Sequence, residues 1–257
     1  MKNLFIVGAQ RSGSTYLYQA LDGHPQVSMV HPVRPEPKFF MNEQLVARGK
    51  DFYENNYFSD RKAETLYLGE KSTSYIESNE AAQRMHAFYP DARILMILRD
   101  PVLRAYSNYR FSVAHRLEEL TFREALEAEP DRLKNAKFTT SVTPFAYRKR
   151  GHYIDYIEAY LEVFDASQLG ILVFEEFVND LASVQSLYRW LEIDDDFVPE
   201  SLEEVFNPAT VEKKYQSDVF RDLALSYTDS IARLESYLGR RVDAWREYHG
   251  KIIGDFS

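Results

Sequence analysis

The first twenty residues constrain the fold of this chain most strongly. Residues 4–7 are a short apolar run typical of a buried strand, and a small polar turn bounded by Gly8 and Gly13 follows. From Ser14 onward, apolar residues recur at helical spacing. A strand, a glycine loop and a helix start together direct backbone N–H groups and the positive end of the helix toward an anion. The sequence therefore predicts a phosphate-binding loop at residues 8–15.

This loop departs at one position from the pattern that binds nucleoside triphosphates. That pattern, G-x-x-x-x-G-K-[ST], places a lysine directly after the second glycine. Here Ser14 occupies the lysine position, Thr15 keeps the expected hydroxyl, and the cation is Arg11 within the loop. Because the missing lysine is the group that reaches the β- and γ-phosphates, a nucleoside triphosphatase is disfavoured. A cradle for a phosphate remains the expectation.

Composition sets limits on partners and location. The 257 residues, 45% hydrophobic and 28% charged, are enough for one α/β domain with a sizeable core. A net charge of −9 argues against nucleic acid as the main partner. No cysteine is present, and no apolar run approaches membrane-spanning length, so we expect a cytoplasmic protein without a membrane partner. The sequence leaves the oligomeric state open.

The rest of the chain alternates between strand and helix patterns. We expect strands near residues 27–30, 65–71, 93–98 and 169–174, and helices over 78–89, with Ser78 as a candidate N-cap, and over 101–115, 181–191 and 223–238. A long helix is expected over 144–164, with Gly151 as a candidate break, and a further short helix starts at Thr121. Residues 43–64 are expected to be partly helical, and residues 130–143 to be a polar connection. This order predicts an α/β, P-loop-like three-layer fold, in which helices flank a central parallel sheet in a single domain over residues 1–257.

The strand at 93–98 ends at a second candidate anion site. Asp100 and Pro101 are the residues that favour a helix start, so Arg99 is expected at the carboxyl end of a central strand. In open α/β sheets that edge is where ligands bind. An arginine there suits a bare anion better than a metal-bound one. The alternative is that Arg99 forms an ion pair with Asp100.

Residues 31–40 contain three prolines, which favour an extended, stiff path. On such a path Glu36 and Lys38 would point the same way. Spacing alone favours a solvated surface loop anchored by Phe39 and Phe40. The basic cluster at residues 148–150 is likewise interpreted as a solvated face.

Taken together, these pieces resemble the sulfotransferases that use 3′-phosphoadenosine 5′-phosphosulfate. Residues 8–15 are similar to that family's 5′-phosphosulfate loop, and Arg99-Asp100-Pro101 with Ser107 to its 3′-phosphate element. Residues 36–40 and 69–75 resemble the Glu-x-x-Phe-Phe and Glu-Lys-Ser-x-x-Tyr segments of the glycosaminoglycan-type, heparan sulfate sulfotransferase-like branch. The resemblance is collinear from residue 3 to about residue 116.

The resemblance implies a role for each matching residue. Glu36 matches the general base, Arg11 would bind the 5′-phosphosulfate, Lys71 matches a second catalytic lysine, and Lys38 lies close enough in sequence to share that work. No metal is implied. The implied nucleotide-binding residues are Gln10, Arg11, Ser12, Gly13, Ser14, Thr15, Arg99, Ser107, Lys213 and Lys214.

The acceptor is expected to differ from that of the animal glycosaminoglycan enzymes. This chain is acidic and shows neither their membrane anchor nor their late cysteine pair. These differences point to a bacterial-type cytoplasmic enzyme acting on a hydroxyl, or an amine, of a small-molecule acceptor. Three alternatives remain: a sulfotransferase acting on a saccharide or polysaccharide, a P-loop-like nucleotide kinase, and a non-catalytic nucleotide-binding module. The last would be expected to lose Glu36 and Lys71, yet both are present.

Overall fold

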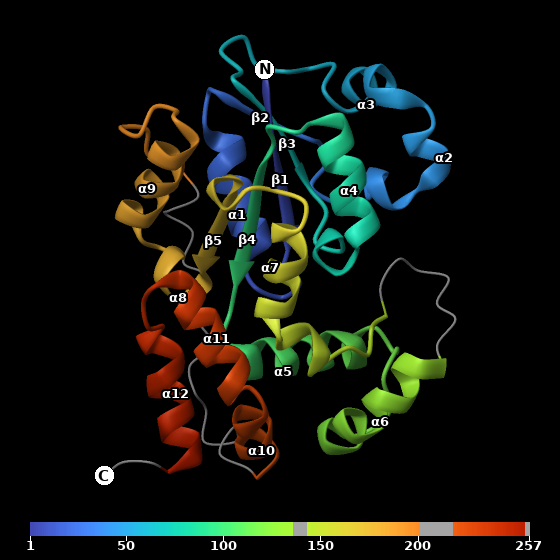
Figure 1. Ribbon diagram of the computed structural model, residues 1–257, viewed down its shortest axis with the longest axis vertical. Helices are drawn as coiled ribbons and strands as arrows, with labels where there is room; N and C mark the ends of the chain where they lie inside the picture. Colours follow the sequence, from blue (N-terminus) through green and yellow to red (C-terminus); the bar gives the residue numbers. More distant parts are fainter. Residues whose placement is uncertain (136–142, 201–217, 255–257) are drawn as a thin grey trace. The chain divides into compact units, whose positions relative to one another are not determined.

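The structure, a computed structural model, describes residues 1–135, 143–200 and 218–254. They fall into two compact units, each formed by two separate stretches of the chain. The first unit combines residues 1–98 with 158–206, and the second combines residues 99–157 with 207–257. Figure 1 shows the strands of the first unit and labels the elements of both.

The first unit is built on a five-stranded parallel sheet in the order β2-β3-β1-β4-β5. The predicted central parallel sheet is therefore confirmed. β1 lies in the middle and pairs with β3 and β4, so that Ile6 stands opposite both Lys71 and Leu95. The strands are β1 (Lys2–Gly8), β2 (Val27–Met29), β3 (Tyr67–Lys71), β4 (Arg93–Leu98) and β5 (Leu169–Val173).

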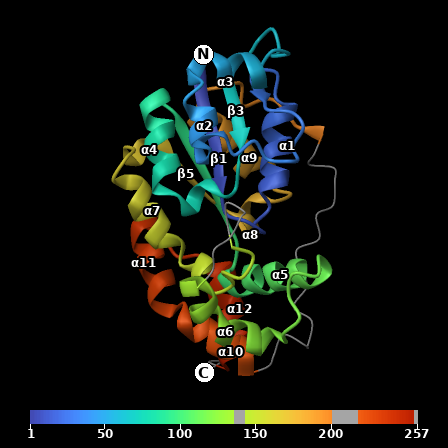
Figure 2. The ribbon, with the colours of Figure 1, turned by 90° about the vertical axis from the view of Figure 1, so that its right-hand side faces the viewer.

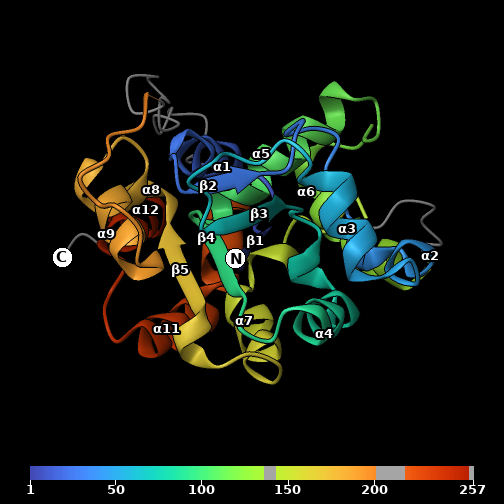
Figure 3. The same cartoon turned by 90° about the horizontal axis from the view of Figure 1, so that it is seen from above.

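Helices cover both faces of this sheet because side chains alternate along each strand. Leu4 and Ile6 join a core with α1 (Ser14–Gly23) and α9 (Leu181–Leu191). On the opposite face Phe5 contacts Phe40 and Tyr89, with ring centroids 5.4 and 6.0 Å apart, beside α4 (Asn79–Phe88). Figure 3, viewed from above, shows α1 and α9 on one side of the strands and α4 on the other.

Short elements connect these layers. The partly helical stretch expected at residues 43–64 contains two helices, and Ser78 caps α4 as predicted, because its side chain accepts a hydrogen bond from the Ala81 N–H. The connecting elements are η1 (Phe39–Met41), α2 (Glu43–Val46), α3 (Gly49–Tyr57), η2 (Tyr75–Glu77), η4 (Ala166–Gln168) and α8 (Phe174–Phe177).

The second unit is helical in its described residues, as Figure 2 shows. Asp100 caps its first helix as predicted, and α7 (Tyr153–Leu161) continues from this unit into the first. The other elements of the unit are α5 (Pro101–Ala114), α6 (Phe122–Asn135), η3 (Lys149–Gly151), α10 (Asp218–Ser226), α11 (Thr228–Leu238) and α12 (Asp243–Ile253).

Several helices differ in length from the sequence-based predictions. The helical stretch expected over 144–164 is shorter than predicted, and its break at Gly151 is confirmed, because η3 ends at Gly151 and α7 begins at Tyr153. At the start of η3 the Arg148 and Lys149 N–H groups donate to the Glu129 carboxylate. The helix expected over 223–238 is two helices that meet at Tyr227. Helix α6 continues to Asn135 through Pro130, and α12 was not predicted. In the part of the chain that is described, no helix is long and apolar enough to cross a membrane.

Candidate functional site

The loop between β1 and α1 leaves no room for a side chain at either of its glycines. Gly13 has φ +86°, and a Cβ there would lie 2.4 Å from Cδ2 of Phe174, so both the backbone and the available space require glycine. Arg11 also lies in the left-handed region, with φ 68°. At the other end of the loop, a Cβ on Gly8 would lie 2.8 Å from Cβ of Ile76. The predicted strand, glycine loop and helix start are confirmed.

The polar groups of this loop suit a bound phosphate. Helix α1 begins without a side-chain cap, so its first N–H groups are available to an anion. Ser12 is fully buried, yet its Oγ has no hydrogen-bond partner among the described residues. Arg11 is exposed, Ser14 is buried, and Gln10 and Thr15 are half-buried. An orphaned hydroxyl beside an uncapped helix start is what an anion-binding loop would supply.

The second part of the site is an ion pair between Glu36 and Lys71. Glu36 Oε1 lies 2.6 Å from Lys71 Nζ. The Thr73 N–H donates to Oε2 at 3.0 Å, and the Thr73 hydroxyl lies 3.0 and 3.1 Å from the two carboxylate oxygens. The Lys71 side chain is 3% exposed and that of Glu36 15%. The interpretation of residues 31–40 as a solvated loop is therefore wrong at Glu36, because the carboxylate is held from one side by a buried lysine.

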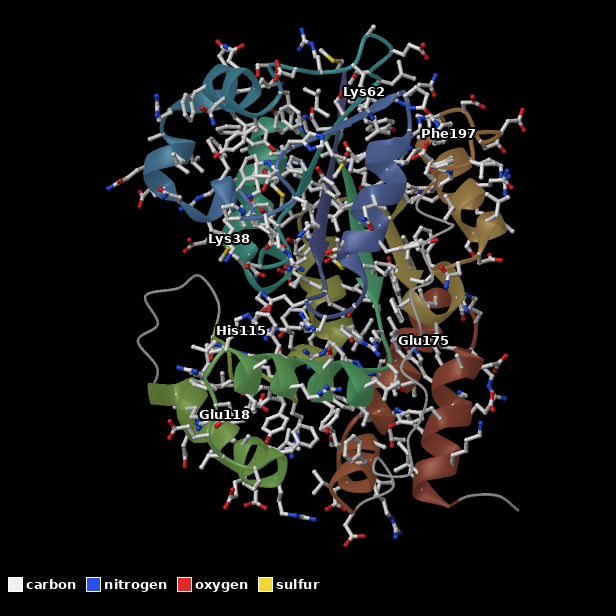
Figure 4. The ribbon with its side chains drawn as sticks, turned by 180° about the vertical axis from the view of Figure 1, so that it is seen from behind. Lys38, Lys62, His115, Glu118, Glu175 and Phe197 are labelled. Atoms are coloured by element: carbon white, nitrogen blue, oxygen red, sulfur yellow. The ribbon has the colours of Figure 1, made fainter. Side chains whose placement is uncertain are left out.

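The extended backbone expected around Glu36 does not continue through Lys38. Its backbone is left-handed, with φ 50° and ψ 32°, and its N–H donates to Ser72 Oγ at 2.9 Å. The expectation that the two side chains point the same way required an extended backbone, and the turn at Lys38 removes that condition. Figure 4 labels Lys38, which is half-buried.

Glu70, beside Lys71 on β3, is a group whose importance the sequence did not reveal. Its carboxylate is fully buried and accepts hydrogen bonds from Tyr53 OH at 2.7 Å, Ser72 Oγ at 2.6 Å and Tyr75 OH at 2.6 Å. Burial raises the pKa of the Glu70 carboxyl above its ordinary value, and these three hydrogen bonds oppose the shift. Burial likewise raises the pKa of the Tyr53 and Tyr75 hydroxyls, so both remain donors.

The Arg99 element lies in the second unit and is held through its backbone. The Arg99 carbonyl accepts a hydrogen bond from Tyr153 OH at 2.7 Å. The Asp100 carboxylate accepts from the Leu103 N–H at 2.9 Å and lies 2.8 Å from His249 Nε2. Arg99 follows the last residue of β4 as predicted, and Ser107 lies half-buried in α5.

The basic cluster at residues 148–150 is not simply a solvated face. Arg150 is 1% exposed, and its guanidinium donates to Asn108 Oδ1 and to the Thr143 carbonyl, each at 2.8 Å. Lys213 and Lys214 lie outside the described residues. Within residues 1–135, 143–200 and 218–254, no group of three or more histidine or acidic side chains could hold a metal ion.

Comparisons with known proteins identify the family and the fold. Residues 1–244 match the family model described as a sulfotransferase domain. The fold is similar to the crystal structure of a sulfotransferase from Alicyclobacillus acidocaldarius, with a TM-score of 0.77 and 31% identity, covering 96% of this chain and 99% of that one.

Curated relatives include two bifunctional heparan sulfate N-deacetylase/N-sulfotransferases. Enzyme 1 of Mus musculus is 32% identical over 176 residues, which are 66% of this chain and 19% of the relative. Enzyme 3 of Homo sapiens is 31% identical over 193 residues, which are 72% of this chain and 21% of the relative. The match thus spans about a fifth of the length of these relatives.

Proposed function

The chain belongs to the sulfotransferase family, and we propose that it transfers a sulfuryl group from 3′-phosphoadenosine 5′-phosphosulfate to a hydroxyl, or to an amine, of a small-molecule acceptor. One observation carries this proposal. The Glu36–Lys71 pair stands at the end of β3 beside Ile6 of β1, from which the phosphate-type loop continues. A carboxylate and a cation therefore lie at the carboxyl ends of β3 and β1, close to the loop that precedes α1.

The residues at this edge have separate tasks. When bound, the donor supplies the sulfuryl group and a phosphate leaving group. The N–H groups of residues 12–15 and the Thr15 hydroxyl would hold its 5′-phosphate, with Gln10 and Arg11 alongside. Arg99 and Ser107 would hold the 3′-phosphate. Lys213 and Lys214 remain proposed contacts of the nucleotide, and no resident metal is assigned a task.

Glu36 is the proposed general base. Its carboxylate would take the proton of the acceptor hydroxyl or amine, and the hydrogen bonds from Thr73 hold it in one orientation. Lys71 and Arg11 supply positive charge for the negative charge that develops on the leaving oxygen, and Lys38 is proposed to assist them. Positioning and charge then provide most of the catalysis, as in phosphoryl transfer.

Replacing the base tests this assignment. Glu36→Gln keeps the shape of the side chain but cannot accept the proton, so turnover should fall on the order of 10²-fold or more while donor affinity changes little. Thr73→Val keeps the carboxylate and the Thr73 N–H contact but loses the hydroxyl, so it should lower turnover much less than Glu36→Gln. Full turnover in Glu36→Gln would assign the base to another group, such as His31.

Donor binding distinguishes a sulfotransferase from a kinase. Adenosine 3′,5′-bisphosphate should raise the melting temperature in the presence of EDTA, whereas ATP with Mg²⁺ should not raise it further. Adenosine 5′-phosphate should bind at least about tenfold more weakly, because a charge-assisted arginine contact to the 3′-phosphate is lost. Equal affinity for the two nucleotides would contradict the role of Arg99.

The acceptor class rests on charge. A long polyanion would meet net repulsion from a chain with a charge of −9, so we propose a neutral or cationic metabolite and a cytoplasmic enzyme whose residues 1–257 act as one catalytic domain. A saccharide acceptor is the second candidate, because the curated relatives are named for heparan sulfate. Transfer to small alcohols and cationic natural products should exceed transfer to heparan-like oligosaccharides. Transfer to the oligosaccharides alone would overturn the proposed acceptor.

A further inference from the structure

Glu70 and Lys71 are consecutive residues of β3, so their side chains leave opposite faces of the sheet. Lys71 forms an ion pair with Glu36, whereas the buried Glu70 carboxylate accepts hydrogen bonds from three hydroxyl groups. We propose that Glu70 is a positioning residue that fixes the backbone of residues 36–40 and so holds Glu36 against Lys71. The effect of Glu70 on catalysis rests on the proposed function, but its effect on the backbone of residues 36–40 does not.

Two of the three hydroxyls connect Glu70 to this segment. Ser72 Oγ donates to Glu70 and accepts from the Lys38 N–H at 2.9 Å. Tyr75 OH donates to Glu70 and accepts from the Phe40 N–H at 3.0 Å. A hydroxyl has one hydrogen, and donation of it to the carboxylate leaves oxygen lone pairs for the amide. The buried charge therefore sets the direction of both hydrogen bonds.

These two amides lie two and four residues after Glu36. The turn at Lys38 is left-handed, a conformation that a lysine adopts at a cost and keeps when its surroundings hold it. Hydrogen bonds at Lys38 and Phe40 secure the two sides of that turn. Without them, the stiff segment through Pro35 and Pro37 would no longer present the Glu36 carboxylate to Lys71 and Thr73.

The third hydroxyl provides a matched control. Tyr53 OH donates to Glu70 Oε2 from α3, and within the described residues it makes no hydrogen bond to the 36–40 segment. Tyr53 and Tyr75 are both fully buried, and both rings contact Phe40, at centroid distances of 5.3 and 6.0 Å. Tyr53→Phe and Tyr75→Phe thus remove the same atom from equivalent surroundings. The Phe40 amide loses its acceptor in Tyr75→Phe but keeps it in Tyr53→Phe.

Amide hydrogen exchange measures this difference directly. Tyr75→Phe should speed exchange at Phe40 by at least about tenfold relative to Tyr53→Phe, and Ser72→Ala should do the same at Lys38. Glu70→Ala should speed both, whereas Glu70→Gln, whose amide oxygen can still accept from Ser72 and Tyr75, should largely restore them. The Leu95 amide in β4 reports on global unfolding. Equal Phe40 exchange in the two tyrosine variants, after correction for that reference, would overturn the proposal.

Kinetics test the consequence for the reaction. Tyr75→Phe should lower kcat by about tenfold with the donor KM unchanged, and Tyr53→Phe should stay within about twofold of the parent. A merely structural role would lower kcat equally in both variants, and that result would overturn the positioning role. If the parent protein transfers no sulfuryl group while exchange changes as expected, the proposed function fails and the role of Glu70 in the backbone stands.

Discussion

The two ends of α1 differ in whether a side chain binds their backbone groups. At the C-terminal end, Lys62 Nζ donates to the carbonyls of Asp22, His24 and Val27, the last two at 2.9 and 2.8 Å. Figure 4 shows Lys62 and Phe197 at this end of the helix. At the N-terminal end no side chain caps the helix, and Ser12 Oγ is buried without a partner among the described residues.

The C-terminal end of α1 therefore contributes to stability, whereas its N-terminal end is available for ligand binding. Free carbonyls at a helix end cost stability unless a donor reaches them, and Lys62 reaches those of Asp22 and of the C-cap residue His24, together with that of Val27 at the start of β2. The N–H groups at the other end are left to a ligand, and Phe174 lies so close that only glycine fits at position 13 of the loop. Substitutions at the first end should therefore change stability, and those at the second should change donor affinity.

The largest effect is expected at Gly13. Gly13→Ala places a Cβ against Phe174 at a positive φ, so the loop must shift, and affinity for adenosine 3′,5′-bisphosphate should fall by roughly 100-fold. Gly49→Ala is the matched control, because Gly49 has φ +85° and a Cβ added there would have nothing within 4 Å. Calorimetric titration should show unchanged affinity for Gly49→Ala. An equal loss in both variants would contradict the role of the Phe174 contact.

The next effect is expected at Lys62. Lys62→Met removes the Lys62 hydrogen bonds to three carbonyls, of which that of His24 keeps the Val27 N–H as a donor, and the free energy of unfolding should fall by about 2 kcal/mol, measured by urea titration. Nucleotide affinity should not change. Lys50→Met, which removes an exposed lysine 3.9 Å from Glu54, should have little effect on stability. A loss of affinity in Lys62→Met would show that the two ends are not independent.

A smaller effect of pH is expected at the same end. His24 Nε2 bonds the Asp194 carbonyl at 2.8 Å, while Nδ1 accepts from the Gln26 N–H at 3.1 Å, so the neutral ring fits this site. Burial lowers the pKa of His24 below 6.5, although the Asp194 hydrogen bond opposes this. The unfolded chain therefore takes up the proton at a higher pH than the folded chain, and stability should fall as pH drops from about 7 to 5. His24→Asn should flatten this dependence in urea titrations, and an unaltered slope would assign it to other groups.

The smallest effect is expected at Ser12. Because its hydroxyl has no partner to lose among the described residues, Ser12→Ala should leave the free energy of unfolding unchanged or slightly higher. Affinity for adenosine 3′,5′-bisphosphate should fall by about threefold to tenfold if the hydroxyl bonds the donor. Ser12→Ala would then lower nucleotide affinity without lowering stability, and Lys62→Met would lower stability without lowering nucleotide affinity. Destabilisation by Ser12→Ala without a change in affinity would refute the comparison.

Local pattern predicted those parts of the site that are local in sequence. The loop before α1, the strand that ends just before Arg99 and the cap at Asp100 each depend on a few adjacent residues, and each is confirmed. The burial of Glu36 could not be predicted from spacing, because it depends on Lys71 and Thr73 from another strand segment.

Long-range hydrogen bonds likewise could not be predicted from local pattern. The Glu129 carboxylate binds the N–H groups of Arg148 and Lys149 at the start of η3, and the periodicity near residue 148 does not indicate this contact. Local pattern places Glu70 in a strand that ends in charge, and its three hydroxyl partners include Tyr53, which precedes it in α3. The partners of a buried carboxylate become visible when tertiary structure brings them together.

The interrupted path of the chain through the first unit has a consequence for synthesis on the ribosome. Strand β4 ends at Leu98, but its neighbour β5 and helix α9 follow after residues 99–157 have been made. Until then, the face of the nascent sheet that carries Leu4 and Ile6 lacks the cover that α9 supplies in the finished core. Long-range parallel pairing is slow, and exposed apolar faces favour aggregation. The growing chain should therefore depend on chaperones from the emergence of β4 until α9 has left the ribosome.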